Sequence, residues 1–425
     1  MSQTISALNV TSRADPGRWP DVAEVPRCPA RGAVARALLR RTASRLPVRV
    51  TSPGGVAFGA GDKGSPVLTL RRPADFYQRI GAAGLIGFGE SYMAGDWDCD
   101  DLTGLLTAFA SQVGTLVPRP LQALRRFYVR RAPAGDDASE GNARRNIHRH
   151  YDLSNDLFAL FLDETMTYSS ALFAQDADGA PIAAGSLLAE AQRRKIDRLL
   201  DLAGVGPSSR VLEIGTGWGE LAIRAAMRGA QVRTVTLSQE QRALATERIE
   251  RAGLASRVAV DMRDYRQVTG QFDAILSVEM IEAVGARYWP DYFAALSRLL
   301  APGGRIGLQS ITMPHRRMMA TRYTHTWVLK YIFPGGLIPS VTAIERNAAG
   351  VGLRVAGRRD FGAHYAETLR LWREWFCAAE ADVALLGFDE VFRRMWLLYL
   401  CYAEAGFRSG YLDVAQFQLV KEGSG

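Results

Sequence analysis

A buried strand that runs into a glycine-rich turn and then into a helix is the feature of this sequence that most restricts its fold. Residues 210–214 are largely apolar, residues 215–219 read Gly-Thr-Gly-Trp-Gly, and residues 220–227 have the spacing of an amphipathic helix. Such glycines let the backbone approach a ligand closely, although they can also form only a tight turn between core elements. Glu220 stands where a dinucleotide fingerprint has its third glycine, which disfavours an NAD or FAD site and indicates another nucleotide-type cofactor.

Four further segments along the chain read as strands, and helical segments separate them. They span residues 231–237, 257–262, 272–278 and 304–312. Strands that alternate with helices predict an α/β protein with a doubly wound, mostly parallel sheet that binds its ligand across the carboxyl ends of the strands. This arrangement resembles the class I methyltransferase fold, whose cofactor is S-adenosyl-L-methionine.

The 425 residues are long for one domain, and shifts in composition divide them. The predicted parts are a disordered tail over 1–28, a small N-terminal α+β domain over 29–116, a proline-bearing linker over 117–143 and a methyltransferase domain over 144–425. Within the last part, residues 314–340 interrupt the sheet pattern and residues 365–407 are helical and aromatic. Such insertions are typical of a helical lid over the substrate.

Two segments of the N-terminal domain carry distinct patterns. Residues 33–46 read as a basic amphipathic helix with Arg36, Arg40 and Arg41 on its polar face. Such a helix fits either a membrane surface or packing on its own domain. Residues 87–97 read GFGESYMAGDW, and their glycine and aromatic residues predict a loop.

The formal net charge is +8, and because the chain has only four lysines, nearly all of its positive charge is arginine, which binds phosphate groups in a bidentate manner. Arginines cluster in residues 31–49, 125–131 and 144–149. Solvated helix faces would explain any one cluster. Three of them favour an acidic partner, either nucleic acid or an anionic membrane surface.

Cysteine usage and hydropathy indicate the compartment. The four cysteines are widely scattered without metal-ligand spacing, so we expect neither a metal site nor a disulfide framework. This cysteine usage fits a reducing environment. Residues 1–10 lack the pattern of a secretion signal, and the longest uncharged run, 102–117, is too short and too polar to span a bilayer. The expected location is cytoplasmic, with peripheral association at the inner face of the membrane.

Four motifs carry a more specific resemblance. They read HYDLSNDLF at 150–158, MTYSSA at 166–171, EMIEAVG at 279–285 and KYIFPGG at 330–336. Together they resemble the cyclopropane fatty-acyl-phospholipid synthase family, over residues 30–420. The segments GFDE at 387–390 and EAGFRSGYL at 404–412 look closest to the branch of that family that makes tuberculostearic (10-methylstearic) acid.

The resemblance implies transfer of the methyl group of S-adenosyl-L-methionine to the double bond of an unsaturated fatty acyl chain, with oleoyl phospholipid as the expected substrate. The proton acceptor in that family is a bicarbonate ion held by a Cys, a Glu, a His, a backbone position at an Ile and a Tyr. The matching positions here are Ser170, Glu282, Gln309, Ile311 and Tyr365. Ser and Gln can still hydrogen-bond an oxyanion, but neither supplies the charge of a protonated His.

The same resemblance implies which residues hold the cofactor. Tyr168 and Ser169 are expected over the methionine part of the cofactor, and the backbone of Gly215, Gly217 and Gly219 is expected along it. Glu213 is expected to orient the loop or the cofactor amine. The residues expected near the ribose are Thr236, Leu237, Ser238 and Gln241, and those expected beside the adenine are Asp264 and Tyr265. Aromatic faces stabilise a carbocation without being methylated, which gives Tyr168 and Tyr365 a further role.

The changed pair Ser170 and Gln309 bears on the product. A cation that loses a proton as a ring closes gives a cyclopropane, whereas a hydride shift before proton loss from the new methyl group gives a 10-methylene chain. We expect the methylene product. A separate reductase would convert it to the 10-methyl acid, since no nicotinamide or flavin fingerprint occurs here. The formation of a homodimer is left open.

Three alternatives remain: a cyclopropane synthase of the same fold, a nucleic-acid methyltransferase, and a non-catalytic lipid-binding protein. The fourth strand is followed by Glu279 and Met280, without the Asn/Asp-Pro-Pro-aromatic motif that grips a flipped base, so we expect no nucleic-acid partner. The intact glycines and the polar residues 238–241 argue against a degenerate cofactor fold.

Overall fold

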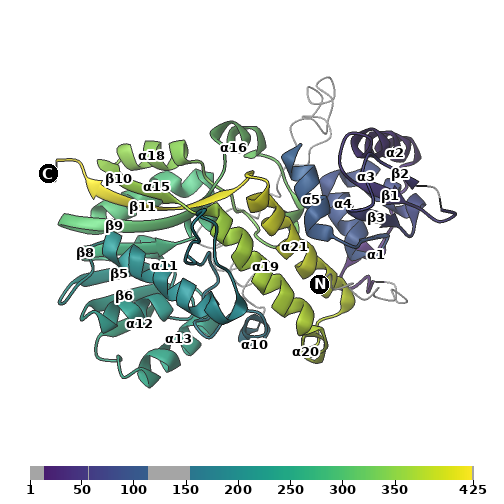
Figure 1. Cartoon of the computed structure of the whole chain (residues 1–425). Coiled ribbons are helices and arrows are strands. Elements are labelled where there is room, and N and C mark those ends of the chain that lie inside the picture. The colour runs from purple at the N-terminus through teal and green to yellow at the C-terminus, as the bar shows by residue number, and fades with distance from the viewer. Residues whose placement is uncertain (1–13, 56, 113–153, 424–425) are drawn as a thin grey trace. The chain divides into compact units, whose positions relative to one another are not determined.

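The fold comes from a computed structural model that describes residues 14–55, 57–112 and 154–423 (Figure 1). They form two compact units. The first takes its described residues from Met1–Arg131, Thr324–Lys330 and Phe376–Tyr411, and the second from Ala132–Tyr323, Tyr331–Trp375 and Leu412–Gly425. The sequence analysis placed 324–330 and 376–411 in the methyltransferase domain. The expected linker lies almost wholly outside the described residues, so the domain boundaries stay a prediction.

The first unit is an α+β structure, as expected. Its sheet has the order β2-β1-β3-β4, with β1 (Arg49–Thr51), β2 (Ala57–Phe58), β3 (Val67–Leu70) and β4 (Trp97–Cys99). The helices are α1 (Pro20–Ala23), α2 (Pro29–Ala43), α3 (Pro73–Ala83), α4 (Leu85–Met93), α5 (Leu102–Ser111), α20 (Glu380–Leu385) and α21 (Glu390–Arg408), together with most of α17 (Trp327–Tyr331). Helix α21 packs against α4 and α5.

Part of the segment expected as a disordered tail is structured. Pro20–Ala23 forms α1, Val22 is buried, and the indole Nε1 of Trp19 donates a 2.8 Å hydrogen bond to Asp389. Residues 1–13 lie outside the described part of the chain. The half-buried ring of Trp19 and the buried side chain of Val22 favour an ordered segment, which its polar composition did not predict.

The loop predicted over residues 87–97 is instead helix α4 followed by the start of β4. Its glycines serve close packing: a Cβ on Gly87 would lie 2.0 Å from the carbonyl oxygen of Arg79, and a Cβ on Gly89 would lie 2.3 Å from the Trp327 ring. The gain from this contact outweighs the low helix propensity of glycine, which misled the sequence-based prediction.

The second unit contains a seven-stranded sheet of order β10-β11-β9-β8-β5-β6-β7. Its strands are β5 (Arg210–Ile214), β6 (Gln231–Thr236), β7 (Val258–Met262), β8 (Phe272–Val278), β9 (Leu300–Thr312), β10 (Leu353–Asp360) and β11 (Asp413–Lys421). Strands β5 to β9 run parallel, and β11 is antiparallel to both of its neighbours. The expected mostly parallel sheet is confirmed, with two more strands than the five predicted from the sequence.

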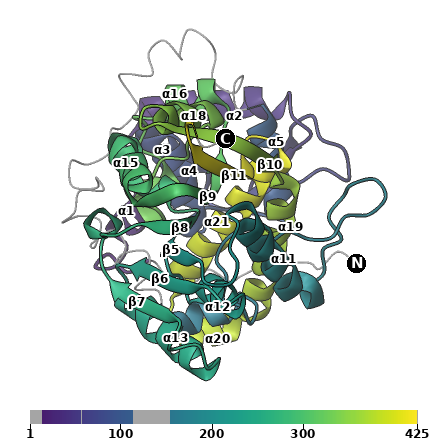
Figure 2. The same cartoon turned by 90° about the vertical axis from the view of Figure 1, so that its left-hand side faces the viewer.

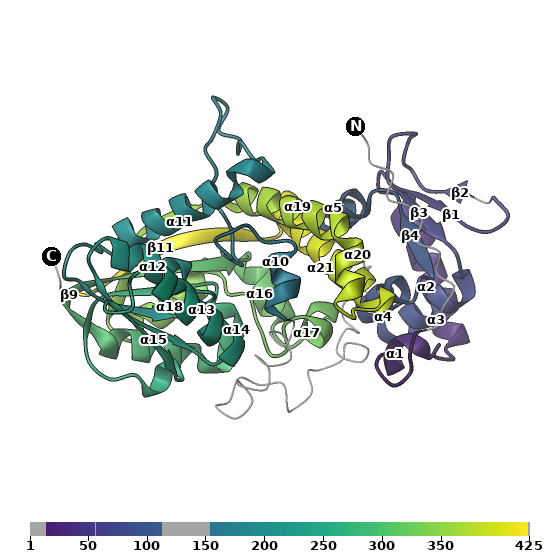
Figure 3. The same ribbon diagram turned by 90° about the horizontal axis from the view of Figure 1, so that it is seen from below.

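Helices cover both faces of this sheet (Figures 2 and 3). Helices α11 (Leu188–Leu202), α12 (Glu220–Met227) and α13 (Gln239–Arg251) lie on one face, and α15 (Trp289–Leu299) and α18 (Val341–Ala349) on the other. Val211 joins the core under the first set and Leu212 the core under the second. Because neighbouring strand residues point to opposite faces, a strand buried on both faces is apolar throughout, which explains the signal of β5.

The remaining helices of this unit are α10 (Asn155–Ala159), α14 (Ile281–Val284), α16 (His315–Thr321) and α19 (Gly362–Ala378), the last of which ends in the first unit. As expected, residues 314–340 interrupt the strands of the sheet, and residues 365–407 are largely helical, in α19, α20 and α21. Their role as a lid over the substrate stays a prediction. Across the described ranges, no helix is both long enough and apolar enough to cross a membrane.

Candidate active site

The turn after β5 has the backbone conformation that its glycines predict. Gly215, Gly217 and Gly219 have φ values of 97°, 52° and 91°, which side chains disfavour, and Gly219 caps the first turn of α12. A Cβ on Gly215 would lie 2.7 Å from the side chain of Met280, whereas a Cβ on Gly217 would meet nothing within 4 Å. The space beside Gly217 is therefore open.

Glu213 lies at the end of β5 and has an unused polar atom. The residue is buried, and its Oε2 has no hydrogen-bond partner among the described residues. Burial raises the pKa of Glu213 to about 8, although the hydroxyl of Thr234 and the charge of Lys195 favour its ionised form. An unpartnered buried carboxyl beside an open glycine turn fits a bound cofactor that carries an amine or hydroxyl groups.

The residues expected near the ribose form a connected group at the end of β6. The Thr236 hydroxyl donates to Gln241 Oε1 at 3.0 Å and accepts from the Ser238 backbone, and Ser238 caps α13 by accepting from the Gln241 amide at 3.2 Å. Leu237 is half-buried. These bonds fix the shape of the turn between β6 and α13.

Asp264 and Tyr265, expected beside the adenine, are already engaged after β7. The Asp264 carboxylate accepts two hydrogen bonds from the Arg266 guanidinium and one from its backbone. The Tyr265 ring packs edge-on against Tyr292 at 5.4 Å. These contacts fix the positions of both side chains after β7, and their expected place beside the adenine stays a prediction.

Tyr168 and Ser169 lie beside a buried aromatic cluster and a buried lysine. The Tyr168 ring stacks on Trp372 with ring centroids 5.2 Å apart and contacts Phe158 and Phe161. Ser169 Oγ accepts a 2.7 Å hydrogen bond from Lys195 Nζ. Burial lowers the pKa of Lys195 to about 8, against the opposing attraction of Glu279 and other carboxylates.

Three of the five positions expected to bind an oxyanion converge on Glu279. Its Oε1 accepts from the Ser170 backbone N–H at 3.0 Å and from Gln309 Nε2 at 2.9 Å, and its Oε2 accepts from the Tyr365 hydroxyl at 2.7 Å. The Ser170 hydroxyl instead bonds the Ala171 carbonyl. Glu279 follows β8, so the carboxyl ends of β8 and β9 and helix α19 meet at one carboxylate.

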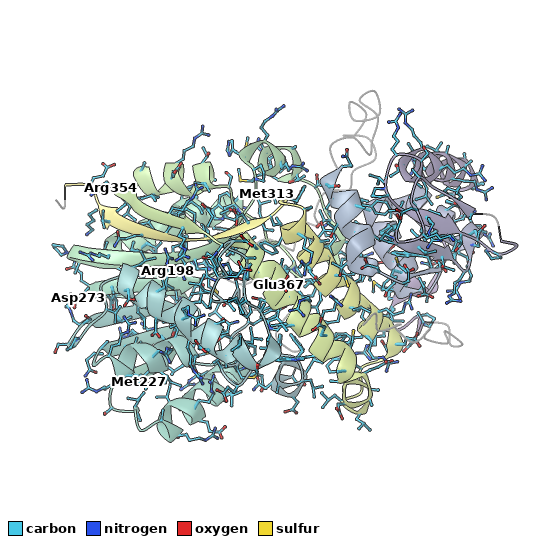
Figure 4. All side chains as sticks on the ribbon, in the orientation of Figure 1. Arg198, Met227, Asp273, Met313, Arg354 and Glu367 are labelled. Atoms are coloured by element: carbon cyan, nitrogen blue, oxygen red, sulfur yellow. The ribbon has the colours of Figure 1, made fainter. Side chains whose placement is uncertain are left out.

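A buried amide relay fixes the orientation of Gln309. Gln416 on β11 donates from Nε2 to both Gln309 Oε1 and the Lys195 carbonyl, each at 3.0 Å. Its oxygen accepts from Arg198 on α11, which is labelled in Figure 4 together with Glu367 of α19. Because Gln416 donates to the side-chain oxygen of Gln309, the NH₂ group of Gln309 points toward Glu279 and donates to it.

The other two expected positions bond each other. Glu282 Oε1 accepts from the Ile311 backbone N–H at 2.5 Å and from the Ser310 hydroxyl at 3.0 Å. Its Oε2 is buried without a partner among the described residues. Burial and the nearby charge of Glu279 raise the pKa of Glu282 to about 8. Burial also raises the pKa of Glu279, whereas its three donors and Lys195 favour its ionised form.

Comparison with known proteins identifies the family. The family model for mycolic acid cyclopropane synthetase matches residues 138–417. The chain belongs to this cyclopropane synthase family. The tuberculostearic acid methyltransferase UfaA1 of Mycobacterium tuberculosis is 58% identical over 99% of this chain and 98% of its own length. The cyclopropane-fatty-acyl-phospholipid synthase of Escherichia coli K12 is 34% identical over 88% of this chain and 92% of its own.

A solved member of the cyclopropane synthase family shares the fold of about two thirds of this chain. The mycolic acid cyclopropane synthase CmaA1, complexed with SAH and CTAB, has a TM-score of 0.58 and 31% sequence identity, and it covers 65% of this chain and 97% of its own. The class I methyltransferase fold expected from the sequence is confirmed.

Sequence reasoning missed three residues of this candidate site. Glu279 was noted only as part of a motif, and Lys195 and Gln416 were not singled out. Two signals could have drawn attention to Glu279 and Gln416: a carboxylate directly after a buried strand, and an amide between the apolar residues Ala415 and Phe417. Lys195 lies among other charged residues of α11, so no such signal marks it in the sequence.

Proposed function

We propose that this protein is an S-adenosyl-L-methionine-dependent methyltransferase that modifies the double bond of an unsaturated fatty acyl chain. The expected substrate is an oleoyl phospholipid, and the expected product is a 10-methylene chain that leads to the 10-methyl acid of the tuberculostearic acid pathway. The observation that carries the proposal is 58% identity, over nearly both full lengths, to a tuberculostearic acid methyltransferase. The family membership and the cofactor-type turn support it.

The residues around the turn after β5 suit this cofactor. Gly217 leaves room for it, Glu213 has an unpartnered oxygen for its amine or hydroxyl groups, and Tyr168 offers an aromatic face. When bound, S-adenosyl-L-methionine supplies an electrophilic methyl group, whose S–C bond breaks as the alkene electrons form the new C–C bond. The protein's own task is to orient the alkene, exclude water and stabilise the carbocation that results.

An aromatic cluster within the second unit suits that task. Tyr168 stacks on Trp372, and the Tyr365 ring lies edge-on to Trp372 with centroids 6.2 Å apart. Trp372 and Tyr365 are buried. The faces of such rings attract a cation, by about 2 kcal/mol or more where water is excluded, and an aromatic carbon does not compete for the methyl group as an amine would.

A cyclopropane synthase is the alternative that a specific observation favours, because the Escherichia coli enzyme of that name is 34% identical to this chain. The positions Ser170 and Gln309 favour the methylene product over it, since neither side chain supplies a charged partner for an oxyanion. Reduction to the 10-methyl acid would then need a separate reductase. A non-catalytic lipid-binding protein remains the second alternative. The formation of a homodimer remains a prediction.

We also propose peripheral attachment to an anionic membrane surface. On α2, Arg36, Arg40 and Arg41 are exposed. The other two arginine clusters lie outside the described residues. Near the carboxyl end of β9, helix α16 and its flank expose Met319 and Tyr323 beside exposed arginines. Basic and apolar side chains together suit the headgroup region of a bilayer.

Lipid analysis tests the function directly. The protein would be expressed in an Escherichia coli strain that lacks its own cyclopropane synthase and is fed oleate, and the fatty acids would be examined by mass spectrometry and proton NMR. A methylene-branched chain that appears only with the protein supports the proposal. A cyclopropane would select the alternative, and unchanged oleate with intact cofactor binding would favour a non-catalytic lipid-binding protein.

A further inference from the structure

We infer that the carboxylate of Glu279 is a built-in proton acceptor that takes the place of the bicarbonate ion that the family resemblance implies. This inference rests on the proposed function. It concerns a residue that the family resemblance does not assign, and it predicts a methyltransferase that works without bicarbonate.

The first observation is that bicarbonate does not fit the residues assigned to it. Ser170, Gln309 and Tyr365 direct their donors at Glu279, and the Ile311 N–H donates to Glu282. Four of the five positions therefore donate to carboxylates of the chain itself, and the fifth, Glu282, is one of those carboxylates. A bicarbonate ion bound there would have to displace Glu279 from its three donors, and the charge of the ionised Glu279 would repel it.

The second observation concerns where the negative charge resides. Glu279 accepts three hydrogen bonds and has the buried ammonium group of Lys195 nearby. Glu282 accepts two hydrogen bonds, and one of its oxygens is buried without a partner among the described residues. Two adjacent, partly buried carboxyl groups share a proton more easily than they both ionise, so Glu282 retains the proton and Glu279 is the base.

The third observation is the backbone conformation at this position. Glu279 has a φ of 53°, in the left-handed region where glycine is favoured and larger residues are uncommon. Strained residues of this kind occur where the surrounding structure requires them, often at active sites. The strain is offset here because the same conformation points the carboxylate at its three donors. Glycine at this position would be free of strain and would remove the carboxylate.

Glu279 accepts the proton that is lost in the last step of the reaction. After methyl transfer and the hydride shift, the cation lies on the carbon that bears the new methyl group. One C–H bond of that methyl group breaks, its electron pair forms the exocyclic double bond, and the proton forms an O–H bond on Glu279. The half-buried residue can then release the proton to solvent, while Tyr365 and Gln309 keep the carboxylate oriented.

Two variants and one control test the inference. Rates would be measured with dioleoyl-phosphatidylglycerol vesicles in buffer freed of carbon dioxide, with and without added bicarbonate. Wild type should work at the same rate in both. Glu279→Gly should lose at least 100-fold without bicarbonate and regain a large part of that loss with bicarbonate or formate. Glu279→Gln, which fills the space without a base, should not be rescued. Glu247→Gln, which changes an exposed residue of α13, should match wild type.

Binding of ¹³C-bicarbonate, followed by NMR, adds a readout that does not depend on turnover: Glu279→Gly should bind it and wild type should not. A wild-type rate that rises with bicarbonate, or a Glu279→Gly enzyme that is fully active without it, would overturn the inference and leave the proposed function intact. A wild type that makes no methylated lipid, together with bicarbonate binding to Glu279→Gly alone, would overturn the proposed function and leave the oxyanion site standing.

Discussion

The hydroxyl of Tyr365 donates a 2.7 Å hydrogen bond to Glu279 Oε2, so a helix that follows the sheet orients a carboxylate at the end of β8. Burial raises the pKa of Glu279, and this hydrogen bond opposes that rise because it favours the ionised form. Hydrogen bonds to a charged group contribute about 1.5–3 kcal/mol. The geometry makes Tyr365 a positioning residue for the base as well as part of the aromatic cluster.

We predict that Tyr365→Phe, which keeps the ring, lowers kcat by roughly 10- to 100-fold, because one charged-group hydrogen bond is lost. The pKa of Glu279 should rise, so the acid limb of the pH–rate profile should move to higher pH. Steady-state rates from pH 5 to 9 check both effects. A variant with a lower rate but an unmoved acid limb would contradict the role in orienting Glu279.

The glycine turn allows a prediction about the cofactor. Gly217 has a φ of 52° and open space where its Cβ would stand, so Gly217→Val should fill the expected cofactor position and abolish S-adenosyl-L-methionine binding in calorimetry. Gly253→Val is the matched control, because Gly253 has a φ of 71° and open surroundings at the end of α13. The control should show a similar loss of thermal stability with unchanged affinity. Unchanged affinity in Gly217→Val would refute the cofactor assignment.

Buried titratable groups predict an unusual dependence of stability on pH. The pKa values of Glu213 and Glu282 are raised to about 8 from 4.5, so their stabilising effect is complete below pH 4.5 and is lost as the pH rises to about 8. The pKa of Lys195 is lowered to about 8 from 10.5, so its stabilising effect is lost as the pH falls from 10.5 to about 8. Stability of the cofactor-free protein should therefore be lowest near pH 8.

Urea unfolding between pH 5 and 10 checks this minimum. A tenfold difference in proton affinity between the folded and unfolded states corresponds to about 1.4 kcal/mol of stability, so the minimum should be measurable. Glu213→Gln should flatten the decline below pH 8, Lys195→Met should flatten the rise above it, and the exposed Glu240→Gln should alter neither. A stability that increases steadily from pH 5 to 8 would show that these carboxyl groups are ionised in the folded protein.

Membrane attachment should be electrostatic. Co-sedimentation with vesicles should require anionic lipid and should weaken as salt is added, since each basic residue near such a surface contributes about 1 kcal/mol. Replacing Arg36, Arg40 and Arg41 of α2 with Gln should weaken binding on the order of 100-fold. The matched control replaces Arg354, Arg358 and Arg359, three exposed arginines of β10, of which Figure 4 labels Arg354. Equal binding to neutral vesicles at high salt would exclude the proposal.

The sequence predicted those elements whose signal comes from residues close together in the chain. Strand β5 is apolar on both faces and the turn glycines need positive φ, so both could be read from neighbouring residues. Strands β10 and β11 were missed because β10 alternates polar residues at a sheet edge and β11 follows a long helix, where pairing decides the structure. Glu279 could not be placed because its three partners are 30 to 109 positions away in the chain.

The last prediction concerns the path of hydrogen during product formation. With oleoyl phospholipid carrying deuterium on both alkene carbons, methyl transfer to C10 leaves the cation at C9, and a shift of deuterium from C10 moves the cation to the methyl-bearing carbon. Because Glu279 is fixed by three donors rather than free to move as an ion would be, we expect it to accept a proton only from that second cation. The product should carry two deuterium atoms at C9 and a methylene group at C10, as NMR of the isolated lipid would reveal. One deuterium on each carbon of a three-membered ring would mean that proton loss precedes the shift, and the protein would then be a cyclopropane synthase whose base acts on the first cation.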